Sequence, residues 1–222
     1  MPKVSDAKKR DAEATKKRIL ASAKKAFAKK GLGGARVDDI AENASANKRM
    51  IYHYFGNKEA LFLKTLEDAY LDIRLAEQKL ELDTLPPADA LDKLVCFTWN
   101  YYVANPEFIT LVNSENLHRA KHLKQSKIIS EIHQKFISMV GKLLDRGVSE
   151  GVFRNDIDPV QLNITIAAIG YYYLTNRYTG SIVYQQNLET KEAYDKRLEF
   201  NLTTIRRLVH ACLLYTSDAA DE

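Results

Sequence analysis

Apolar residues recur at helical spacing along most of this 222-residue chain. In the first such stretch, Ile19, Leu20, Ala23, Ala26 and Phe27 fall on one face of a helix over residues 15–30. Alternating apolar and polar runs are scarce, so we do not expect a sheet. The pattern predicts an all-α fold of about nine helices, over residues 15–30, 37–44, 48–55, 58–81, 88–104, 106–118, 125–150, 159–178 and 190–208.

Two short helices make up the most informative segment. Residues 37–44 and 48–55 are joined by residues 45–47, which is the layout of a helix-turn-helix. Asn47 is placed to cap the second helix, and Ile51, Tyr54 and Phe55 give that helix an apolar back. Cations, an imidazole and a phenol occupy its other face, which suits a helix that reads the DNA major groove.

The net charge of +4 is unevenly distributed. Residues 1–60 hold 15 Lys and Arg against 7 Asp and Glu, and the remainder holds 18 against 22. A basic head on an acidic body indicates a polyanionic partner at one end. The alternative is a basic tail that only aids solubility, because residues 3–18 alone supply seven of these cations. Residues 1–14 lack apolar periodicity, and we interpret them as a basic mobile arm.

Residues 15–66 resemble the amino-terminal domain of the tetracycline-repressor (TetR/AcrR) family of transcriptional regulators. The resemblance is carried by Ile40-Ala-Glu-Asn-Ala44, Asn47-Lys48, Ile51-Tyr-His-Tyr-Phe55 and Lys58-Glu-Ala-Leu61. The body resembles the subclass that includes pyrimidine-utilisation regulators, through Glu115-Asn116-Leu117, Gly151-Val-Phe-Arg154, Asp158-Pro159, Asn176-Arg-Tyr-Thr179 and Lys196-Arg197. The resemblance implies a DNA-binding domain over residues 15–60 and a ligand-binding and dimerisation domain over residues 61–211.

The chain departs from the family pattern at three places around the helix-turn-helix. Ser45 stands in the turn where the family usually has Gly, Arg49-Met50 replaces a common Gly-Thr pair, and Arg36-Val37 replaces a frequent Thr pair. A Ser tolerates a positive φ less well than a Gly, and Arg49 adds a long cation to the reading face. The operator sequence therefore cannot be borrowed from a relative.

We expect each DNA-contacting residue to serve either the base edges or the phosphates. Arg49 can form a bidentate pair with guanine, and Met50 can contact a thymine methyl group. The resemblance assigns a backbone phosphate to Lys58, and Arg36 is expected to bind another beside a helix start. The full set of expected contacts is Arg36, Asn47, Lys48, Arg49, Met50, Tyr52, His53 and Lys58. The alternative for the exposed members is an ordinary solvated helix face.

One head reads too few base pairs for selectivity, so we expect a homodimer on a palindrome in double-stranded DNA. The helices over residues 159–178 and 190–208 are the expected interface, which the resemblance implies to be a four-helix bundle. The predicted function is a repressor that an unknown small-molecule effector releases from its operator. The alternatives are an activator, or a regulator gated by a partner protein.

The resemblance also implies a small-molecule pocket enclosed by the fourth to eighth helices. Pockets of this kind combine apolar walls with a few polar groups. The candidates are Trp99, Tyr102, Phe108, Asn113, Asn116, Tyr171, Tyr172 and Asn176. The alternative for each is plain helix packing. No catalytic constellation, phosphate loop or metal-ligand spacing is evident, so we predict no enzyme activity, no metal and no cofactor.

The remaining features of the sequence bear on location and on the carboxyl end. No stretch approaches the roughly 20 apolar residues that span a bilayer, and the basic amino terminus lacks the apolar core of a signal peptide, so we expect a cytoplasmic protein. Cys96 and Cys212 lie among apolar residues and are expected to be buried free thiols. Residues 212–222 resemble a translated sequencing adapter, and we expect them to be a non-native tail.

Overall fold

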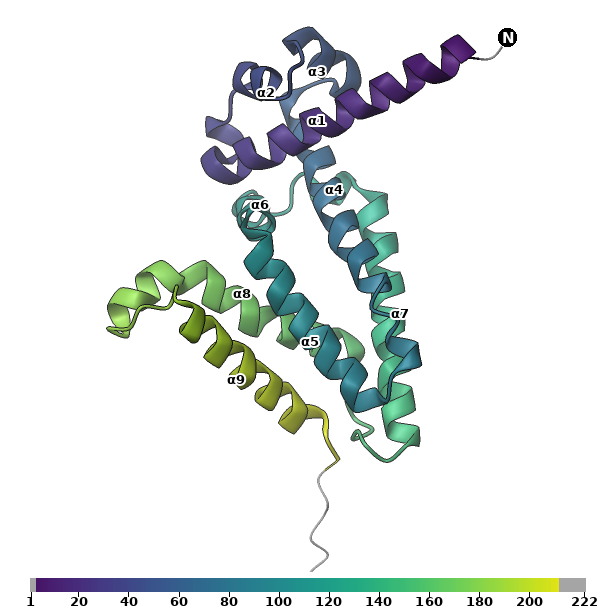
Figure 1. The fold of residues 1–222 in the computed structure, drawn as a ribbon, viewed down its shortest axis with the longest axis vertical. Coiled ribbons are helices and arrows are strands. Elements are labelled where there is room, and N and C mark those ends of the chain that lie inside the picture. The colour runs from purple at the N-terminus through teal and green to yellow at the C-terminus, as the bar shows by residue number, and fades with distance from the viewer. Residues whose placement is uncertain (1–2, 212–222) are drawn as a thin grey trace, which may run out of the picture. The chain divides into compact units, whose positions relative to one another are not determined.

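The computed structural model describes residues 3–211, and the predicted tail over residues 212–222 lies outside this part. Over the described residues the structure contains nine α-helices, which confirms the predicted all-α class (Figure 1). They are α1 (Lys3–Gly34), α2 (Val37–Asn43), α3 (Lys48–Phe55), α4 (Lys58–Gln78), α5 (Pro87–Ala104), α6 (Pro106–Leu117), α7 (Lys127–Ser149), α8 (Pro159–Val183) and α9 (Lys191–Val209). Two 3₁₀ turns, Leu82–Thr84 and Leu123–Gln125, connect some of them.

Helix α1 differs most from the prediction. It begins at Lys3, so residues 3–14 are helical instead of forming an arm outside the helices. Their lack of an apolar stripe misled the prediction, because Ala, Lys, Glu and Arg favour a helix without any apolar face. Near its other end, Gly31 has φ 65° and ψ 175°, which interrupts the helix before Gly34. Gly is the residue that adopts this backbone without strain.

The chain folds as two compact units. Unit 1 comprises Met1–Gln78 with Tyr101–Gln134. Within it α1 contacts α2, α4 and α6, and α3 contacts α2 and α4. The rings of Phe27 and Phe62 meet edge to face at 5.1 Å in its core, and both are fully buried with Ile19, Ile40, Ile51 and Leu61. This core fixes the helix-turn-helix on α1 and α4.

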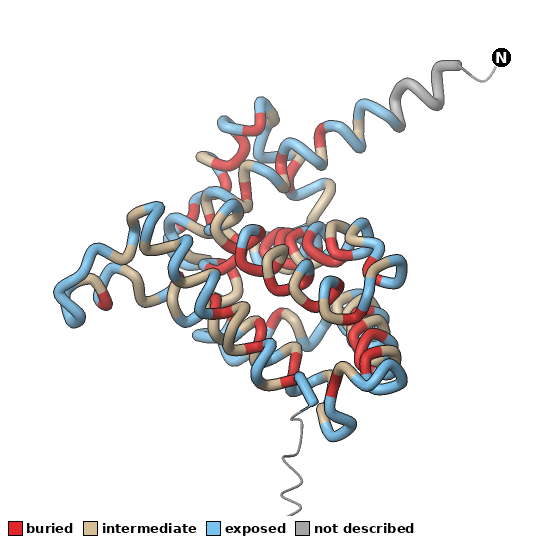
Figure 2. Tube along the Cα trace, turned by 60° about the horizontal axis from the view of Figure 1, so that its bottom comes forward, coloured by how far each residue is buried: buried red, intermediate tan, exposed pale blue. Residues whose placement is uncertain are grey.

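Unit 2 comprises Lys79–Asn100 with Lys135–Glu222, of which residues up to 211 are described. Its buried cluster draws on α5, α7, α8 and α9, and it includes Leu91, Leu94, Val140, Leu162 and Ile205. Buried and exposed positions alternate along these helices, as expected for amphipathic packing (Figure 2). Helix α8 runs on to Val183, beyond the predicted end at 178. Gly180 is buried, and a Cβ there would lie 2.9 Å from Leu188 Cδ1, so the Leu188 side chain would have to shift.

Two smaller expectations also need correction. Cys96 is a free thiol, as predicted, but it is half-buried instead of buried. Tyr54 and Phe55 are half-buried, whereas Ile51 is fully buried as predicted. Helix α3 has only two turns, so one position faces the core directly and its neighbours lie at the edge. The functional division into arm, head, body and tail stays a prediction.

Candidate nucleic-acid interface

The turn between α2 and α3 has the geometry of a helix-turn-helix. Ser45 adopts a positive φ of 50°, the conformation for which Gly is better suited. The Ser45 and Ala46 amides donate to the carbonyls of Glu42 and Ala41 at 3.0 and 2.9 Å. Asn47 then caps α3, as predicted, because its Oδ1 accepts the Met50 amide at 2.9 Å. The chain therefore builds the expected turn with Ser in place of the usual Gly.

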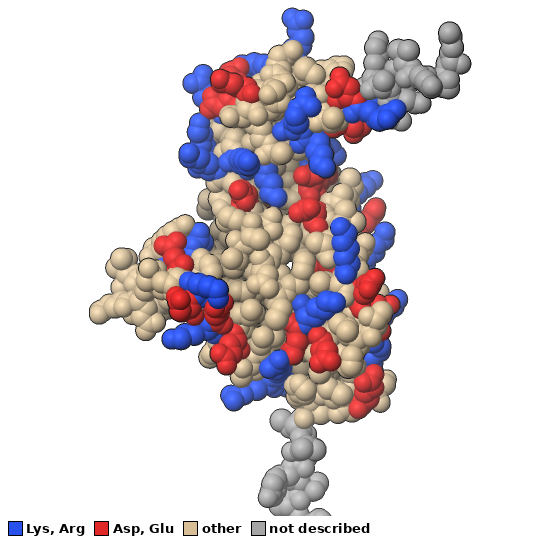
Figure 3. Space-filling view, viewed as in Figure 1, with Lys and Arg blue, Asp and Glu red and all other residues tan. Residues whose placement is uncertain are grey.

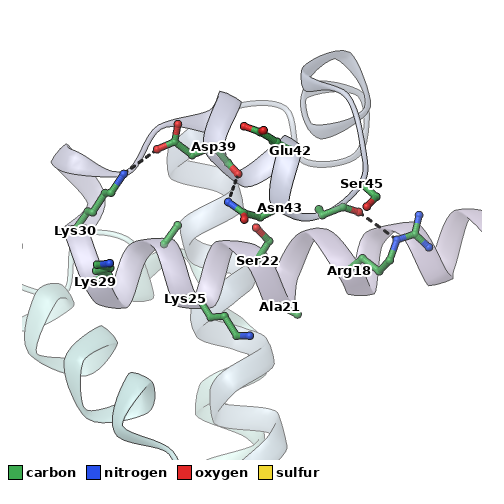
Figure 4. Close-up of a pocket in the computed structure, with 12 residues that line it drawn as sticks. Arg18, Ala21, Ser22, Lys25, Lys29, Lys30, Asp39, Glu42, Asn43 and Ser45 are labelled. Carbon is green, nitrogen blue, oxygen red and sulfur yellow. Dashed lines mark hydrogen bonds and ion pairs between the residues drawn. The ribbon is translucent and has the colours of Figure 1, made fainter.

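Side chains of α1 hold this turn from behind. Arg18 Nε donates to the Ala44 carbonyl at 3.2 Å (Figure 4), and Ser22 Oγ donates to the Ile40 carbonyl at 2.9 Å. Ala44 is the C-cap of α2, and the Ile40 carbonyl also accepts the Ala44 amide at 3.1 Å, so both bonds fasten the end of α2 to α1. The two bonds and the buried Ile51 together orient α3 on unit 1.

The opposite face of α3 is exposed and polar. Lys48, Arg49 and His53 are exposed, Tyr52 is 43% exposed and Met50 is half-buried. Asn47 also reaches the surface, although its Oδ1 is used by the cap. The structure thus brings six of the eight predicted DNA-contacting residues together, on α3 and its cap.

The two predicted phosphate-binding residues flank this face. Arg36 is exposed at the start of α2, where its own side chain makes no capping bond. Lys58 opens α4, and its Nζ donates to the Gly33 carbonyl at 3.2 Å. Asn57 caps the same helix, because its Oδ1 accepts the Ala60 amide at 2.7 Å. Whether these residues meet DNA stays a prediction.

Acidic residues of α2 partner two of the cations in unit 1. Lys48 Nζ lies 3.0 Å from Asp38 Oδ1, and Lys30 Nζ lies 2.8 Å from Asp39 Oδ2. The hydrogen bond with Asp38 raises the pKa of Lys48, and the hydrogen bond with Lys30 lowers the pKa of Asp39. The sequence interpretation missed both pairs, because periodicity treats each helix separately.

A polar groove of about 610 Å³ runs between α1 and α2 (Figure 4). Four cations line it, namely Arg18, Lys25, Lys29 and Lys30, together with the acids Asp39 and Glu42. Lys and Arg side chains also gather over the N-terminal helices in the space-filling view (Figure 3). Unit 1 therefore presents excess positive charge around the helix-turn-helix, as a DNA-binding surface requires.

The predicted effector-binding residues fall into two groups, one in each unit. In unit 1, Tyr102 and Phe108 are buried and stack at 5.9 Å with an angle of 16° between their rings. In the same unit Asn113 is half-buried, and Asn116 is exposed and donates to the Val112 carbonyl at 3.1 Å. The stacked pair provides an apolar wall, and Asn116 is occupied by its own helix.

In unit 2, Trp99 is buried against the rings of Tyr173 and Tyr194, at 5.6 and 5.8 Å. Tyr172 and Asn176 line a shallow groove of about 290 Å³ on α8, whereas Tyr171 is half-buried. Arg197 also lines this groove; the sequence analysis named it only within the family resemblance and not among the pocket residues. Its guanidinium lies 5.5 Å from the ring of Tyr173.

Unit 1 also buries ionisable groups that the sequence interpretation missed. On α4, Arg74 Nη1 lies 2.9 Å from Glu77 Oε2, and the Glu77 side chain is only 2% exposed. Burial raises the pKa of Glu77 to about 8, against the opposing effect of Arg74. Glu115 is also buried, and it accepts the His122 and Leu123 amides at 2.8 and 3.0 Å. Helical periodicity gives no signal for such pairs, since it treats charged residues as solvated.

Among residues 3–211, no three His, Cys, Asp or Glu side chains are grouped as metal ligands. Within the same range, no helix combines the length and apolar character of a membrane span.

Comparison with known proteins places this geometry in a family. Residues 19–65 match the model described as bacterial regulatory proteins, tetR family, and residues 87–205 match a tetracyclin repressor-like C-terminal domain. The transcriptional repressor NicS of Pseudomonas putida is 39% identical over 189 residues, which cover 85% of this chain and 89% of that protein. The transcriptional regulator RutR of Escherichia coli is 34% identical over 93 residues, or 42% of this chain and 43% of that protein.

Solved structures agree with the sequence matches. The transcriptional regulator SCO4942 of Streptomyces coelicolor superposes with a TM-score of 0.66 at 26% identity, covering 88% of this chain and 98% of that one. The fatty acid degradation regulator FadR of Bacillus halodurans shares the fold, with a TM-score of 0.65 at 18% identity over 90% of this chain and 96% of that one. The chain therefore belongs to the TetR family of bacterial transcriptional regulators.

Proposed function

We propose that this protein is a homodimeric repressor that binds a palindromic operator in double-stranded DNA and leaves it when a small molecule binds. The observation that carries the proposal is the exposed polar face of α3, held outward by the buried Ile51 and the Asn47 cap. The related repressor NicS supports the negative sign of regulation. The proposal gives the chain no enzymatic role and places it in the cytoplasm, where its operator would be.

Each residue around α3 has a role in this proposal. Lys48, Arg49 and Met50 stand at the start of α3, where a recognition helix meets base edges. An Arg–guanine pair is worth about 1–3 kcal/mol of discrimination, so Arg49 is the main reader. Tyr52 and His53 serve the groove wall, and Arg36 and Lys58 serve the phosphates on either side.

The dimer is proposed to form through α8 and α9. Large apolar side chains stand exposed along these helices in the single chain, among them Ile164, Ile182, Val183 and Phe200 at 51, 80, 71 and 62%. Soluble proteins rarely leave so many large apolar side chains together in water. A second copy covering this face would place two heads on one duplex.

The effector is proposed to bind in the body and to act by population shift. A ligand moves such an equilibrium only through its differential affinity for the DNA-bound and released states. Tenfold release requires about 1.4 kcal/mol of that difference. The aromatic groups around Phe108 and around Trp99 are the walls available to it. A thermal-shift screen separates this proposal from the alternative in which a partner protein controls DNA binding. Only a protein that senses a small molecule is both stabilised by that molecule and released by it from DNA.

Selection of bound duplexes from a random pool tests the DNA-binding part. The expected product is a palindrome whose half-sites lie about one helical turn, roughly 10 base pairs, apart centre to centre. Enrichment of A·T-rich duplexes that share no motif, or no enrichment at all in low salt, would refute the operator proposal.

Sedimentation of two matched variants tests the dimer. Ile182→Asp places a charge on the proposed interface, where Ile182 is 80% exposed in the single chain. Leu117→Asp changes an equally exposed apolar residue on α6, at 86%. We expect only the first variant to become monomeric and to lose affinity for the selected palindrome. A dimeric Ile182→Asp protein would exclude this part of α8 from the interface.

A further inference from the structure

Lys48 and Arg49, the first two residues of α3, differ in their ion pairing. Lys48 Nζ lies 3.0 Å from Asp38 Oδ1 and 3.1 Å from Asp38 Oδ2, so the α2 carboxylate grips the ammonium with both oxygens. Arg49, the next residue, is exposed and makes no ion pair within the described part of the chain. Asp38 is the second residue of α2, so the contact crosses the turn and ties the two helices of the motif together.

We propose that Asp38 is a positioning residue that makes Lys48 read base edges instead of phosphates. The inference rests on the proposed DNA-binding function. An ammonium has three N–H donors, so Lys48 can keep Asp38 and still donate to a base acceptor. The ion pair favours the rotamers of its flexible four-carbon stem that point away from the nearest phosphate, and the carboxylate itself repels phosphates close to it.

This arrangement acts on specificity more than on affinity. On a non-operator duplex the Lys48 held by Asp38 meets no matching base acceptor, so it adds nothing to the binding free energy. On the operator it meets its acceptor already oriented, so less side-chain freedom is lost on binding. An ion pair that only sequestered Lys48 away from DNA would act differently. If Lys48 had to leave Asp38 to touch any DNA, the ion pair would weaken operator binding at least as much as non-operator binding.

The neighbouring acid provides a matched control. Asp39 pairs with Lys30, which lies at the end of α1 and not on the reading helix (Figure 4). Both acids stand in the first turn of α2, so the change of either to Asn removes one negative charge from the same helix start. Of the two ion pairs, only that of Asp38 involves a residue of α3.

The test compares Asp38→Asn with Asp39→Asn by fluorescence anisotropy, on the duplex selected by the wild-type protein and on a scrambled duplex, over a series of salt concentrations. We expect Asp38→Asn to bind the scrambled duplex about two- to fivefold more tightly, the range that a surface ion pair spans. Its salt slope should steepen by about 0.9, because one more cation reaches a phosphate. Operator affinity should stay level or fall, so the ratio between the two affinities drops.

Three results would overturn the inference. These are an unchanged or higher ratio for Asp38→Asn, an equal drop for Asp39→Asn, and a drop that persists when Lys48→Ala is combined with Asp38→Asn. A parallel loss of affinity on both duplexes is one case of the first result, since it leaves the ratio unchanged and shows a purely structural role. Failure of the proposed function looks different, since the wild-type protein would then prefer no duplex at all.

Discussion

Gly147 in α7 is the position where one added methyl group should damage unit 2 most. A Cβ at this residue would lie 1.9 Å from Cδ2 and 2.5 Å from Cε2 of Phe153. Phe153 is only 3% exposed and belongs to the buried cluster. The Gly147 carbonyl also accepts the Val152 and Phe153 amides at 2.8 and 3.0 Å. These hydrogen bonds fix the backbone of the turn, so the Phe153 ring itself must move to make room for the added Cβ.

The expected loss follows from these contacts. Overpacking a filled core costs about 1–3 kcal/mol, and a ring forced from the cluster loses about 1.5–3 kcal/mol of burial. We expect Gly147→Ala to lower the free energy of unfolding by about 3 kcal/mol, which lowers Tm by about 6–12 °C in a chain of this size. Gly141→Ala is the control on the same helix, because its nearest neighbour, Pro159 Cγ, is 4.0 Å away. That change should stabilise by about 0.5–1 kcal/mol.

The assay is urea unfolding followed by tryptophan fluorescence. Trp99 is the only Trp of the chain, is 4% exposed and lies in unit 2, so its signal reports this unit directly. A Gly147→Ala protein that unfolds at the same urea concentration as the wild type would refute the packing described around Phe153.

Two further predictions concern unit 1. Asn47→Ala removes the cap of α3 and should lower the free energy of unfolding by about 1 kcal/mol. The Met50 amide should then exchange its hydrogen faster, and Asn47→Asp should restore the protection. Unchanged exchange in Asn47→Ala would mean that the cap is unimportant. Glu77 has a pKa raised from 4.5 to about 8 by burial, so the folded state keeps a proton that the unfolded state releases at lower pH. Its contribution to stability is therefore fully present below pH 4.5 and is lost as the pH rises to about 8. Glu77→Gln should flatten the dependence of the unfolding free energy on pH in this window, and identical slopes for the two proteins would contradict the raised pKa.

The sequence was sufficient to predict those helices in which the apolar stripe and the capping residues indicate the same bounds. Asn47 caps α3 as expected, and Ile51 is buried on the apolar side of α3. These features are local, so residue spacing and capping chemistry determine them. Helix propensity without an apolar stripe explains why residues 3–14 of α1 were missed.

Contacts between helices could not be predicted in the same way. The pair between Lys48 and Asp38 depends on the angle between α2 and α3, and the close approach of Gly147 to Phe153 depends on the turn after α7. Neither is encoded in the periodicity of one helix. The aromatic residues expected to form an effector pocket were recognised by type alone, and that assignment stays a prediction.

The central claim is that the exposed face of α3 reads DNA, and binding of one double variant tests it most directly. Lys48→Ala with Arg49→Ala removes both cations at the start of α3 while leaving Ile51 and the cap in place. Lys121→Ala, an exposed cation outside the helix-turn-helix, serves as the control. Anisotropy on the selected duplex should show that the double variant loses selective binding and that the control keeps it. Equal affinity of the wild type and the double variant for that duplex would contradict the account.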